Sequence, residues 1–210
     1  MKKKKIFVQI ASYRDPQLIT TIEDLLNKAD NPDLFSFGIC WQFDETEDTY
    51  RYKDKKNFRI KRYHYSKSQG LGWARAVCNS LYNGEELTLQ LDSHHRFVRG
   101  WDTKCKKMMN DLIAAGYEKP LLTAYVASYN PENDPGARVK EVWKLNFDRF
   151  TPEGVVFMLP AEVEDIDDIT EDVKSLLDTR GSVGMVMRRI FDMGLVQTGV
   201  GGGMNLMGCQ

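Results

Sequence analysis

Glu86-Leu-Thr-Leu-Gln-Leu-Asp-Ser-His-His95 is the most informative segment of this 210-residue chain. Apolar residues alternate along it and stop at Asp92, which is typical of a strand that ends at the edge of a sheet. Side chains of a strand alternate between its two faces, so we expect Asp92 and His94 to point one way and Ser93 and His95 the other. A carboxylate beside an imidazole can bind a divalent cation, and that cation can neutralise a diphosphate. The segment therefore suggests an enzyme that uses a nucleotide-activated donor.

The regions around this segment predict an α/β fold with a mostly parallel central sheet flanked by helices. Nearly continuous apolar runs, as at Ile6–Ile10, are typical of strands buried on both faces, and they alternate with segments of helical periodicity. Strands are expected at 5–12, 35–43, 59–65, 87–91, 121–127 and 155–159, and helices after Asp15-Pro16, at 73–82 and from Gly100. This order of elements indicates one domain over residues 1–180.

The composition is that of an ordinary soluble globular protein, with 42% hydrophobic and 28% charged residues. A net charge of −1 gives no general attraction to nucleic acid, so we expect no nucleic-acid partner. No segment approaches the roughly 20 apolar residues of a membrane span, and Lys2–Lys5 precedes too short an apolar stretch for a signal peptide. Cys40, Cys78, Cys105 and Cys209 have neither metal-finger spacing nor a disulfide framework, which favours reduced thiols and a cytoplasmic setting.

Residues 181–210 form an atypical tail that is rich in glycine and methionine. Neither helical nor strand periodicity continues beyond about Leu195, and such a segment buries too little surface to offset the entropy of ordering it. We therefore expect the tail to be poorly ordered. Gly199-Val-Gly-Gly-Gly203 has the glycines of a phosphate loop but no lysine, and no clean strand precedes it, so it carries little weight as a nucleotide site.

Two further groups of polar residues follow predicted strands. Gly70-Leu-Gly72-Trp-Ala-Arg75 places two glycines before a helix whose amino end favours an anion, and its arginine could reach a phosphate. Ser12-Tyr-Arg14-Asp15 lies at the end of the first strand, where open α/β sheets bind ligands. Each group has a simpler structural explanation: a loop entering an amphipathic helix for the first, helix capping by the aspartate for the second. The Asp-Ser-His segment has one too, a surface aspartate beside a structural histidine.

Three motifs in this chain together resemble a known enzyme family. Ile6-Phe-Val-Gln-Ile-Ala-Ser-Tyr-Arg-Asp-Pro16, Gly72-Trp-Ala-Arg75 and Leu89-Gln-Leu-Asp-Ser-His-His-Arg-Phe97, the last followed by Gly100-Trp-Asp102, occur in the order typical of glycosyltransferase family 60. Its members are UDP-GlcNAc-dependent polypeptide α-N-acetylglucosaminyltransferases, and known members modify hydroxyproline. The resemblance covers roughly residues 5 to 160.

The resemblance implies a GT-A fold, a UDP-sugar donor that is most often UDP-GlcNAc, and a divalent metal, Mn²⁺ or Mg²⁺. It also implies transfer to a hydroxyl of a protein or glycan acceptor with retention of anomeric configuration. Asp92 and His94 correspond to the metal-binding pair of the family. No residue is identified as a catalytic nucleophile. The residues expected to lie against the nucleotide are Ser12, Arg14, Gln42, Gly72 and Arg75.

The resemblance does not extend to the last part of the chain. Members of the family continue with a Gly-Glu-Glu segment and then a histidine-containing region, and Gly181–Gln210 has neither, so we expect a truncated or divergent copy. Two alternatives to an active glycosyltransferase therefore stay open. One is a catalytically impaired remnant that at most binds nucleotide. The other is a nucleotidyltransferase-like metal enzyme, for which Asp44 and Glu45 are the only other carboxylates near a strand end.

Overall fold

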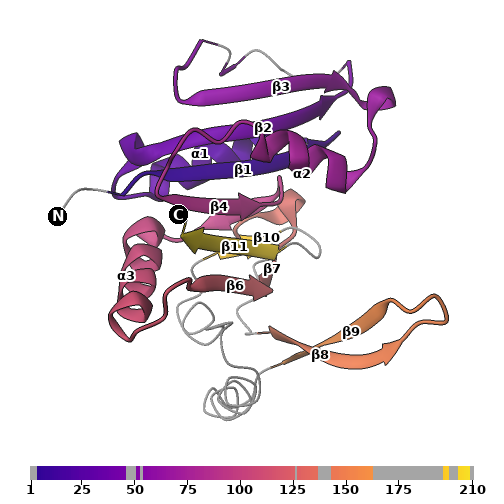
Figure 1. Cartoon of the computed structure of the whole chain (residues 1–210). Coiled ribbons are helices and arrows are strands. Elements are labelled where there is room, and N and C mark those ends of the chain that lie inside the picture. Colours follow the sequence, from indigo (N-terminus) through magenta and orange to yellow (C-terminus); the bar gives the residue numbers. More distant parts are fainter. Residues whose placement is uncertain are drawn as a thin grey trace.

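The computed structural model describes residues 4–45, 51–52, 54–125, 127–136, 143–162, 196–198 and 203–208. A six-stranded sheet in the order β3-β2-β1-β4-β11-β6 is the centre of this part of the chain (Figure 1). Strands β1, β2, β3 and β4 run parallel, and β11 is antiparallel to both of its neighbours. The predicted α/β fold with a mostly parallel sheet is confirmed. The strands are β1 Ile6–Tyr13, β2 Phe35–Phe43, β3 Phe58–His64, β4 Leu87–Leu91, β6 Leu121–Tyr125 and β11 Gly203–Gly208.

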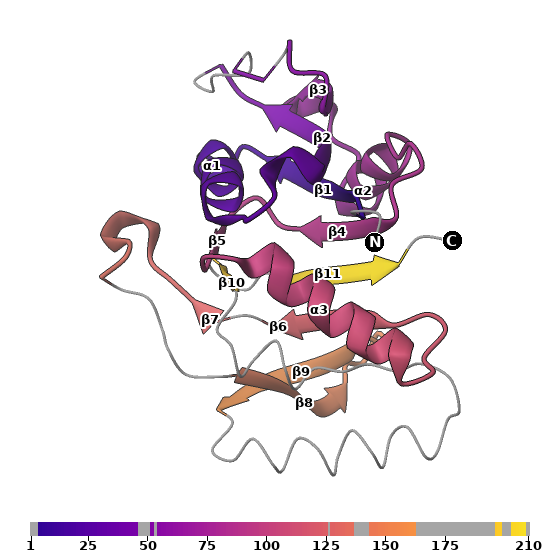
Figure 2. The same ribbon diagram turned by 90° about the vertical axis from the view of Figure 1, so that its left-hand side faces the viewer.

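Helices cover the two faces of the parallel half of the sheet. Helix α1, Leu18–Lys28, and helix α2, Leu71–Asn79, lie on opposite sides of β1 (Figure 2). The face under α1 and α3, Trp101–Ala114, holds the larger core, in which Leu25 and Trp101 pack with apolar residues of β1, β2 and β4. The face under α2 holds a smaller cluster of Cys40, Ala74 and Cys78. Burial of apolar residues on both faces explains the nearly continuous apolar pattern of these strands.

Several elements differ from the sequence-based prediction. Helix α1 begins at Leu18, because the carboxylate of Asp15 accepts a hydrogen bond from the N–H of Gln17 and holds a turn before the helix. Helix α2 begins two residues earlier than predicted, at Leu71, after Gly70 with its φ of 92°. The strand predicted at 121–127 is divided into β6 and β7, Ala127–Ser128. Strand β5, His95–Phe97, was not predicted.

The tail contributes two strands, so the expectation of no regular structure beyond Leu195 is wrong. Strand β10, Val196–Thr198, pairs with β5 and β7 in a second, three-stranded sheet. Strand β11 lies between β4 and β6 in the main sheet and pairs with both. Backbone hydrogen bonds to two neighbouring strands need no side-chain periodicity, which is why the local pattern did not reveal them. The domain boundary proposed between residues 180 and 181 lies outside the described residues.

A two-stranded hairpin extends away from the main sheet (Figure 1). Only its second strand was predicted, at 155–159. Strands β8, Trp143–Phe150, and β9, Val156–Glu162, pair with an irregularity between Phe147 and Arg149, which brings the rings of Phe147 and Phe150 onto one face with centroids 5.3 Å apart. Both rings are more than half exposed.

No helix in the described ranges has the length and apolar character that a membrane span requires. The cysteines within those ranges, Cys40, Cys78 and Cys105, are buried and form no disulfide, in line with the predicted thiols. Burial raises the pKa of Cys40 to about 12 and that of Cys78 to about 11, so both are neutral at physiological pH. Cys209 lies outside the described residues.

A buried carboxylate connects strands at the amino end of the sheet. Glu85 accepts hydrogen bonds from the hydroxyl of Ser36, from Arg59 at 2.5 Å and from the N–H of Asn83 at 2.9 Å. Burial raises the pKa of Glu85, but these hydrogen bonds outweigh it, and the pKa is lowered overall. The charged form therefore stabilises the fold above the unfolded-state pKa, and this contribution is lost as the pH falls through the folded-state value.

We expect Glu85→Gln to lower the free energy of unfolding by about 1–3 kcal/mol at neutral pH, because it leaves Arg59 without its charged partner. The difference from wild type should shrink as the pH falls below about 4.3, the ordinary pKa of a glutamate. Urea denaturation across this pH range measures both effects. The exposed Glu118→Gln is the matched control, and a Glu85→Gln deficit independent of pH would contradict the prediction.

The position of β11 predicts slow amide hydrogen exchange. Its backbone is paired on both sides, so its amides should exchange about as slowly as those of β4, and more slowly than those of the β8–β9 hairpin. Hydrogen–deuterium exchange read out on a peptide that contains 203–208 measures this. Fast exchange there, beside slow exchange at 87–91, would show that the strand is not a stable part of the sheet.

Candidate functional site

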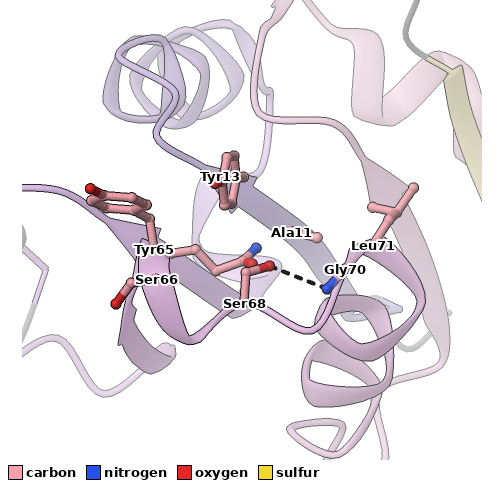
Figure 3. A pocket seen from close by; sticks show the side chains of 8 residues that line it. Ala11, Tyr13, Tyr65, Ser66, Ser68, Gly70 and Leu71 are labelled. Carbon is pink, nitrogen blue, oxygen red and sulfur yellow. Dashed lines mark hydrogen bonds between the residues drawn. The ribbon is translucent and has the colours of Figure 1, made fainter.

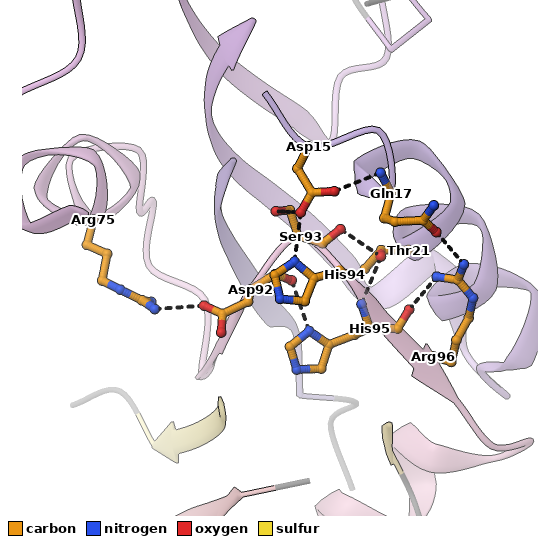
Figure 4. A network of polar contacts seen from close by, with 9 residues as sticks. All are labelled: Asp15, Gln17, Thr21, Arg75, Asp92, Ser93, His94, His95 and Arg96. Atoms are coloured by element: carbon orange, nitrogen blue, oxygen red, sulfur yellow. Dashed lines mark hydrogen bonds and ion pairs between the residues drawn. The ribbon is translucent and has the colours of Figure 1, made fainter. Parts of the chain in front are cut away.

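The candidate site lies at the carboxyl edge of the parallel strands. Strand β1 pairs with β2 on one side and with β4 on the other, so the residues that follow these three strands meet at one edge. Two features lie here. One is a network of polar side chains around Asp92 (Figure 4), and the other is a pocket beside the amino end of α2 (Figure 3).

Asp92 and Arg75 contact each other directly. The guanidinium Nη2 of Arg75 donates a hydrogen bond to Oδ1 of Asp92 at 3.0 Å, and about a quarter of each side chain is exposed. Arg75 comes from α2 and Asp92 directly follows β4 (Figure 4). A residue predicted to contact the nucleotide and a residue predicted to bind the metal are thus joined in an ion pair that a phosphate group could reach.

His94 is held by a carboxylate that the sequence did not reveal as its partner. The ring nitrogen Nδ1 of His94 lies 2.7 Å from Oδ2 of Asp15, and the hydroxyl of Ser93 donates to the same oxygen at 2.6 Å. The hydrogen bond with Asp15 raises the pKa of His94, against the effect of burial. Burial raises the pKa of Asp15, but the hydrogen bonds from His94 and Ser93 lower it overall. The pair therefore favours the charged forms of both groups.

Burial alternates along residues 92–95, with Asp92 and His94 partly exposed and Ser93 and His95 buried. The predicted division between two strand faces is wrong, because residues 93 and 94 form a bend in which Ser93 and His94 both contact Oδ2 of Asp15. The ring of His95 is fully buried, and burial lowers its pKa to about 4, so the imidazole is neutral. Its Nδ1 therefore donates to the carbonyl of Asp92 at 3.0 Å. His95 thus fixes the backbone that carries the Asp92 carboxylate, a role that the sequence did not indicate.

Thr21 of α1 closes the bend from the other side. Its hydroxyl donates to the carbonyl of Ser93 at 2.9 Å and accepts from the N–H of His95 at 2.9 Å. Thr21 is completely buried. A single hydroxyl therefore satisfies two backbone groups of the segment that carries the predicted metal-binding pair.

The pocket has a volume of about 630 Å³, which is in the range of small-molecule sites. Gln42, predicted to line a nucleotide pocket, is among its lining residues. Tyr13 belongs to the group at the end of the first strand that the sequence singled out. Tyr65, Ser66 and Ser68 were not predicted to line the pocket, because no local pattern places the 65–68 turn beside β1. The lining residues are Ala11, Tyr13, Gln42, Tyr65, Ser66, Ser68, Gly70 and Leu71 (Figure 3).

The other predicted nucleotide residues lie around the pocket rather than in its wall. Ser12 is fully buried between Ala11 and Tyr13, so strand alternation directs its side chain to the opposite face. Arg14 has a φ of 49°; its Nε is 3.2 Å from Asp44, and its guanidinium lies 4.6 Å above the ring of Tyr65. A Cβ atom added at Gly72 would meet nothing within 4 Å, so the protein itself does not require a glycine there.

The described residues supply two candidate metal ligands and no cluster of three or more His, Cys, Asp or Glu side chains. The Asp15–His94 contact fits a metal-binding histidine, because such a histidine usually donates its second ring N–H to a carboxylate. Asp44 and Glu45, the carboxylates considered for a nucleotidyltransferase, instead pair with Arg14 and with His64. Among the described residues, Asp44 and Glu45 therefore do not join Asp92 in a centre with several carboxylates.

The family of the chain follows from a sequence comparison. The model of the family described as Glycosyltransferase (GlcNAc) matches residues 5–54 and 47–178. The chain belongs to this glycosyltransferase family. No curated protein sequence matches this chain.

Two solved structures align with part of this chain. GalNAc-T7 with UDP, GalNAc and Mn²⁺ aligns with 85% of this chain and 32% of its own, at 15% identity and a TM-score of 0.56. TarS 1–349 of S. aureus in complex with UDP-GlcNAc aligns with 62% of this chain and 37% of its own, at 22% identity and a TM-score of 0.44. The chain thus corresponds to about a third of the length of each. The likeness to GalNAc-T7 supports the GT-A-type fold.

We expect Thr21→Val to destabilise the protein, because it removes a hydroxyl and keeps the shape of the side chain. Two buried backbone groups lose their partner, at about 1–3 kcal/mol for each unsatisfied group. Thermal and urea denaturation measure the loss. The exposed neighbour Thr20→Val is the matched control on the same helix. Equal stability of the two variants would mean that the 92–95 bend does not depend on this hydroxyl.

Proposed function

We propose that this chain binds a UDP-sugar with a divalent metal and transfers the sugar to a hydroxyl of a protein or glycan. We propose GlcNAc as the sugar. The observation that carries the proposal is the meeting of three features at one edge of the sheet. These are the aromatic-lined pocket, the amino end of α2 with Arg75, and the Asp92–His94 pair.

The three features suit the nucleoside, the diphosphate and the metal of a nucleotide-sugar complex. The pocket has the size and the aromatic side chains to hold the nucleoside. Helix α2 begins at Leu71, in the wall of the pocket, and the unpaired N–H groups of its first turn favour an anion such as a diphosphate. Arg75 lies one turn further along the helix and adds a positive charge. The Asp92–His94 segment follows on the other side of Arg75 (Figure 4).

Asp92 and His94 are the residues that would hold the metal. With Nδ1 of His94 bonded to Asp15, Nε2 is the ring nitrogen that a cation would use. Oxygen atoms of the diphosphate would complete a coordination shell of the kind that Mn²⁺ or Mg²⁺ prefers. The cation would stabilise the negative charge that develops on the departing UDP. Asp15 fixes the tautomer and orientation of His94, and His95 fixes the backbone at Asp92.

The choice of sugar, acceptor and stereochemistry rests on relatives. The matching family carries GlcNAc in its description, which supports UDP-GlcNAc as the donor. GalNAc-T7 binds UDP, GalNAc and Mn²⁺ on the same fold, which supports a UDP-sugar with a metal. The resemblance of the motifs to glycosyltransferase family 60 suggests a hydroxyproline acceptor and retention of configuration.

We expect UDP and Mn²⁺ to bind cooperatively. Each should raise the melting temperature more in the presence of the other, because the cation neutralises repulsion between the diphosphate and Asp92. Asp92→Asn should abolish this cooperativity, and Asp15→Asn should weaken Mn²⁺ binding about 10–100-fold by releasing His94. Calorimetric titration of Mn²⁺ in the presence of UDP measures both.

Asp111→Asn, on the exposed side of α3, is the control and should bind like wild type. Full Mn²⁺-dependent UDP binding by Asp92→Asn would show that the metal assignment is wrong. Transfer of radiolabelled GlcNAc to a hydroxyproline peptide tests the reaction itself. Tight UDP binding without transfer to any hydroxyl acceptor would instead favour a nucleotide-binding remnant.

A further inference from the structure

The side-chain amide of Gln42 has a hydrogen-bond partner for its nitrogen but none, among the described residues, for its oxygen. Its nitrogen Nε2 donates to the carbonyl of Ser12 at 3.0 Å, whereas its oxygen Oε1 is buried and has no hydrogen-bond partner among the described residues. The carbonyl can only accept, so it fixes the orientation of the amide with the nitrogen toward β1. Gln42 as a whole is 3% exposed, yet it is part of the pocket wall. A buried acceptor without a donor costs free energy unless a ligand supplies the donor.

The backbone around this amide is held firmly. The carbonyl of Gln42 accepts from the N–H of Arg14 at 2.9 Å, and β2 pairs here with β1 and β3, so that Gln42 lies beside Tyr13 and Tyr63. The amide cannot easily turn to present its NH₂ group instead, because that would leave the carbonyl of Ser12 without its donor. Gln42 Oε1 can therefore accept a hydrogen bond from a ligand donor, and a ligand acceptor at the same position would be repelled.

Other groups of the pocket complete the chemistry of a planar base. The rings of Tyr13 and Tyr65 lie edge to face with centroids 6.5 Å apart, and Tyr13 is 52% exposed, so an aromatic surface is available for stacking. Ser68 Oγ accepts from the N–H of Gly70 at 3.2 Å, which leaves its hydroxyl proton able to donate (Figure 3). The pocket lining thus holds both an acceptor and a donor, the groups that a ligand edge with an N–H beside a C=O requires.

We propose that Oε1 of Gln42 accepts the N3–H of a uracil base, and that this contact selects uridine over cytidine nucleotides. The inference rests on the proposed function, which places the nucleoside of a UDP-sugar in this pocket. Uracil presents N3–H between two carbonyls. Cytosine presents an unprotonated N3 at the same position, so the two acceptors would face each other. Gln42 is then a specificity-determining residue, positioned by the main chain of Ser12.

The test compares three nucleotides on the full chain with Mn²⁺ present: UDP, 3-methyl-UDP, in which a methyl group replaces the N3–H, and CDP. Calorimetry should give binding of UDP about 10- to 100-fold tighter than of either analogue, because each leaves the buried acceptor unpaired. CDP carries no added methyl group, so its weak binding separates the hydrogen bond from simple steric exclusion.

Gln42→Met keeps the length of the side chain and removes the acceptor. Its affinities for the three nucleotides should lie within about threefold of one another, a smaller difference than one buried hydrogen bond produces. Arg75→Ala is the matched control: it should weaken all three while keeping their ratio, since Arg75 faces the phosphate side. Equal binding of UDP and 3-methyl-UDP by wild type would overturn the inference and leave the proposed donor intact. Folded wild-type protein that binds no UDP at all would overturn both.

Discussion

Strand β1 pairs in parallel with β2 on one side and β4 on the other, and the candidate site depends on this central position. Parallel pairing places the carboxyl ends of all three strands at one edge. The register between β1 and β2 aligns Tyr13 with Gln42, so both side chains line the pocket. The register between β1 and β4 aligns Ile10 with Leu91, so the chain after β4 passes the turn after β1. Asp15 and His94, distant in sequence, meet for that reason. Without this pairing neither the pocket nor the network would exist.

The two adjacent histidines show how much the environment changes one side chain. His94 is partly exposed and bonded to Asp15, which raises its pKa, whereas His95 is buried and its pKa is about 4. One ring is suited to bind a cation or carry a charge, and the other is a neutral donor to the main chain of Asp92. The sequence His94-His95 alone does not distinguish them. Their positions in the fold do, because His94 lies in the bend after β4 and is partly exposed, whereas His95 begins β5 and is buried in the core.

Much of the fold follows from local sequence patterns, but the contacts of the site do not. The apolar runs at Ile6–Ile10 and Leu87–Leu91 predicted β1 and β4, and the end of β2 predicted a role for Gln42. The Asp15–His94 contact, the tyrosines of the pocket and the place of β11 all depend on which strands are neighbours. Strand order is set by packing of the whole chain, so no local pattern of a single segment reveals it. Ser12 was placed at the correct strand end, but its side chain lies on the other face.

The position of β11 constrains the order in which the sheet can form during synthesis. Strands β1 to β4 form a parallel unit from the early part of the chain, and this unit can pair as soon as β4 has left the ribosome. Strand β6 follows but does not contact β4 directly, because β11 lies between them. The edge of β4 therefore stays open to other strands until residues 203–208 have been translated, and a nascent chain paused before that point exposes a strand edge that invites aggregation.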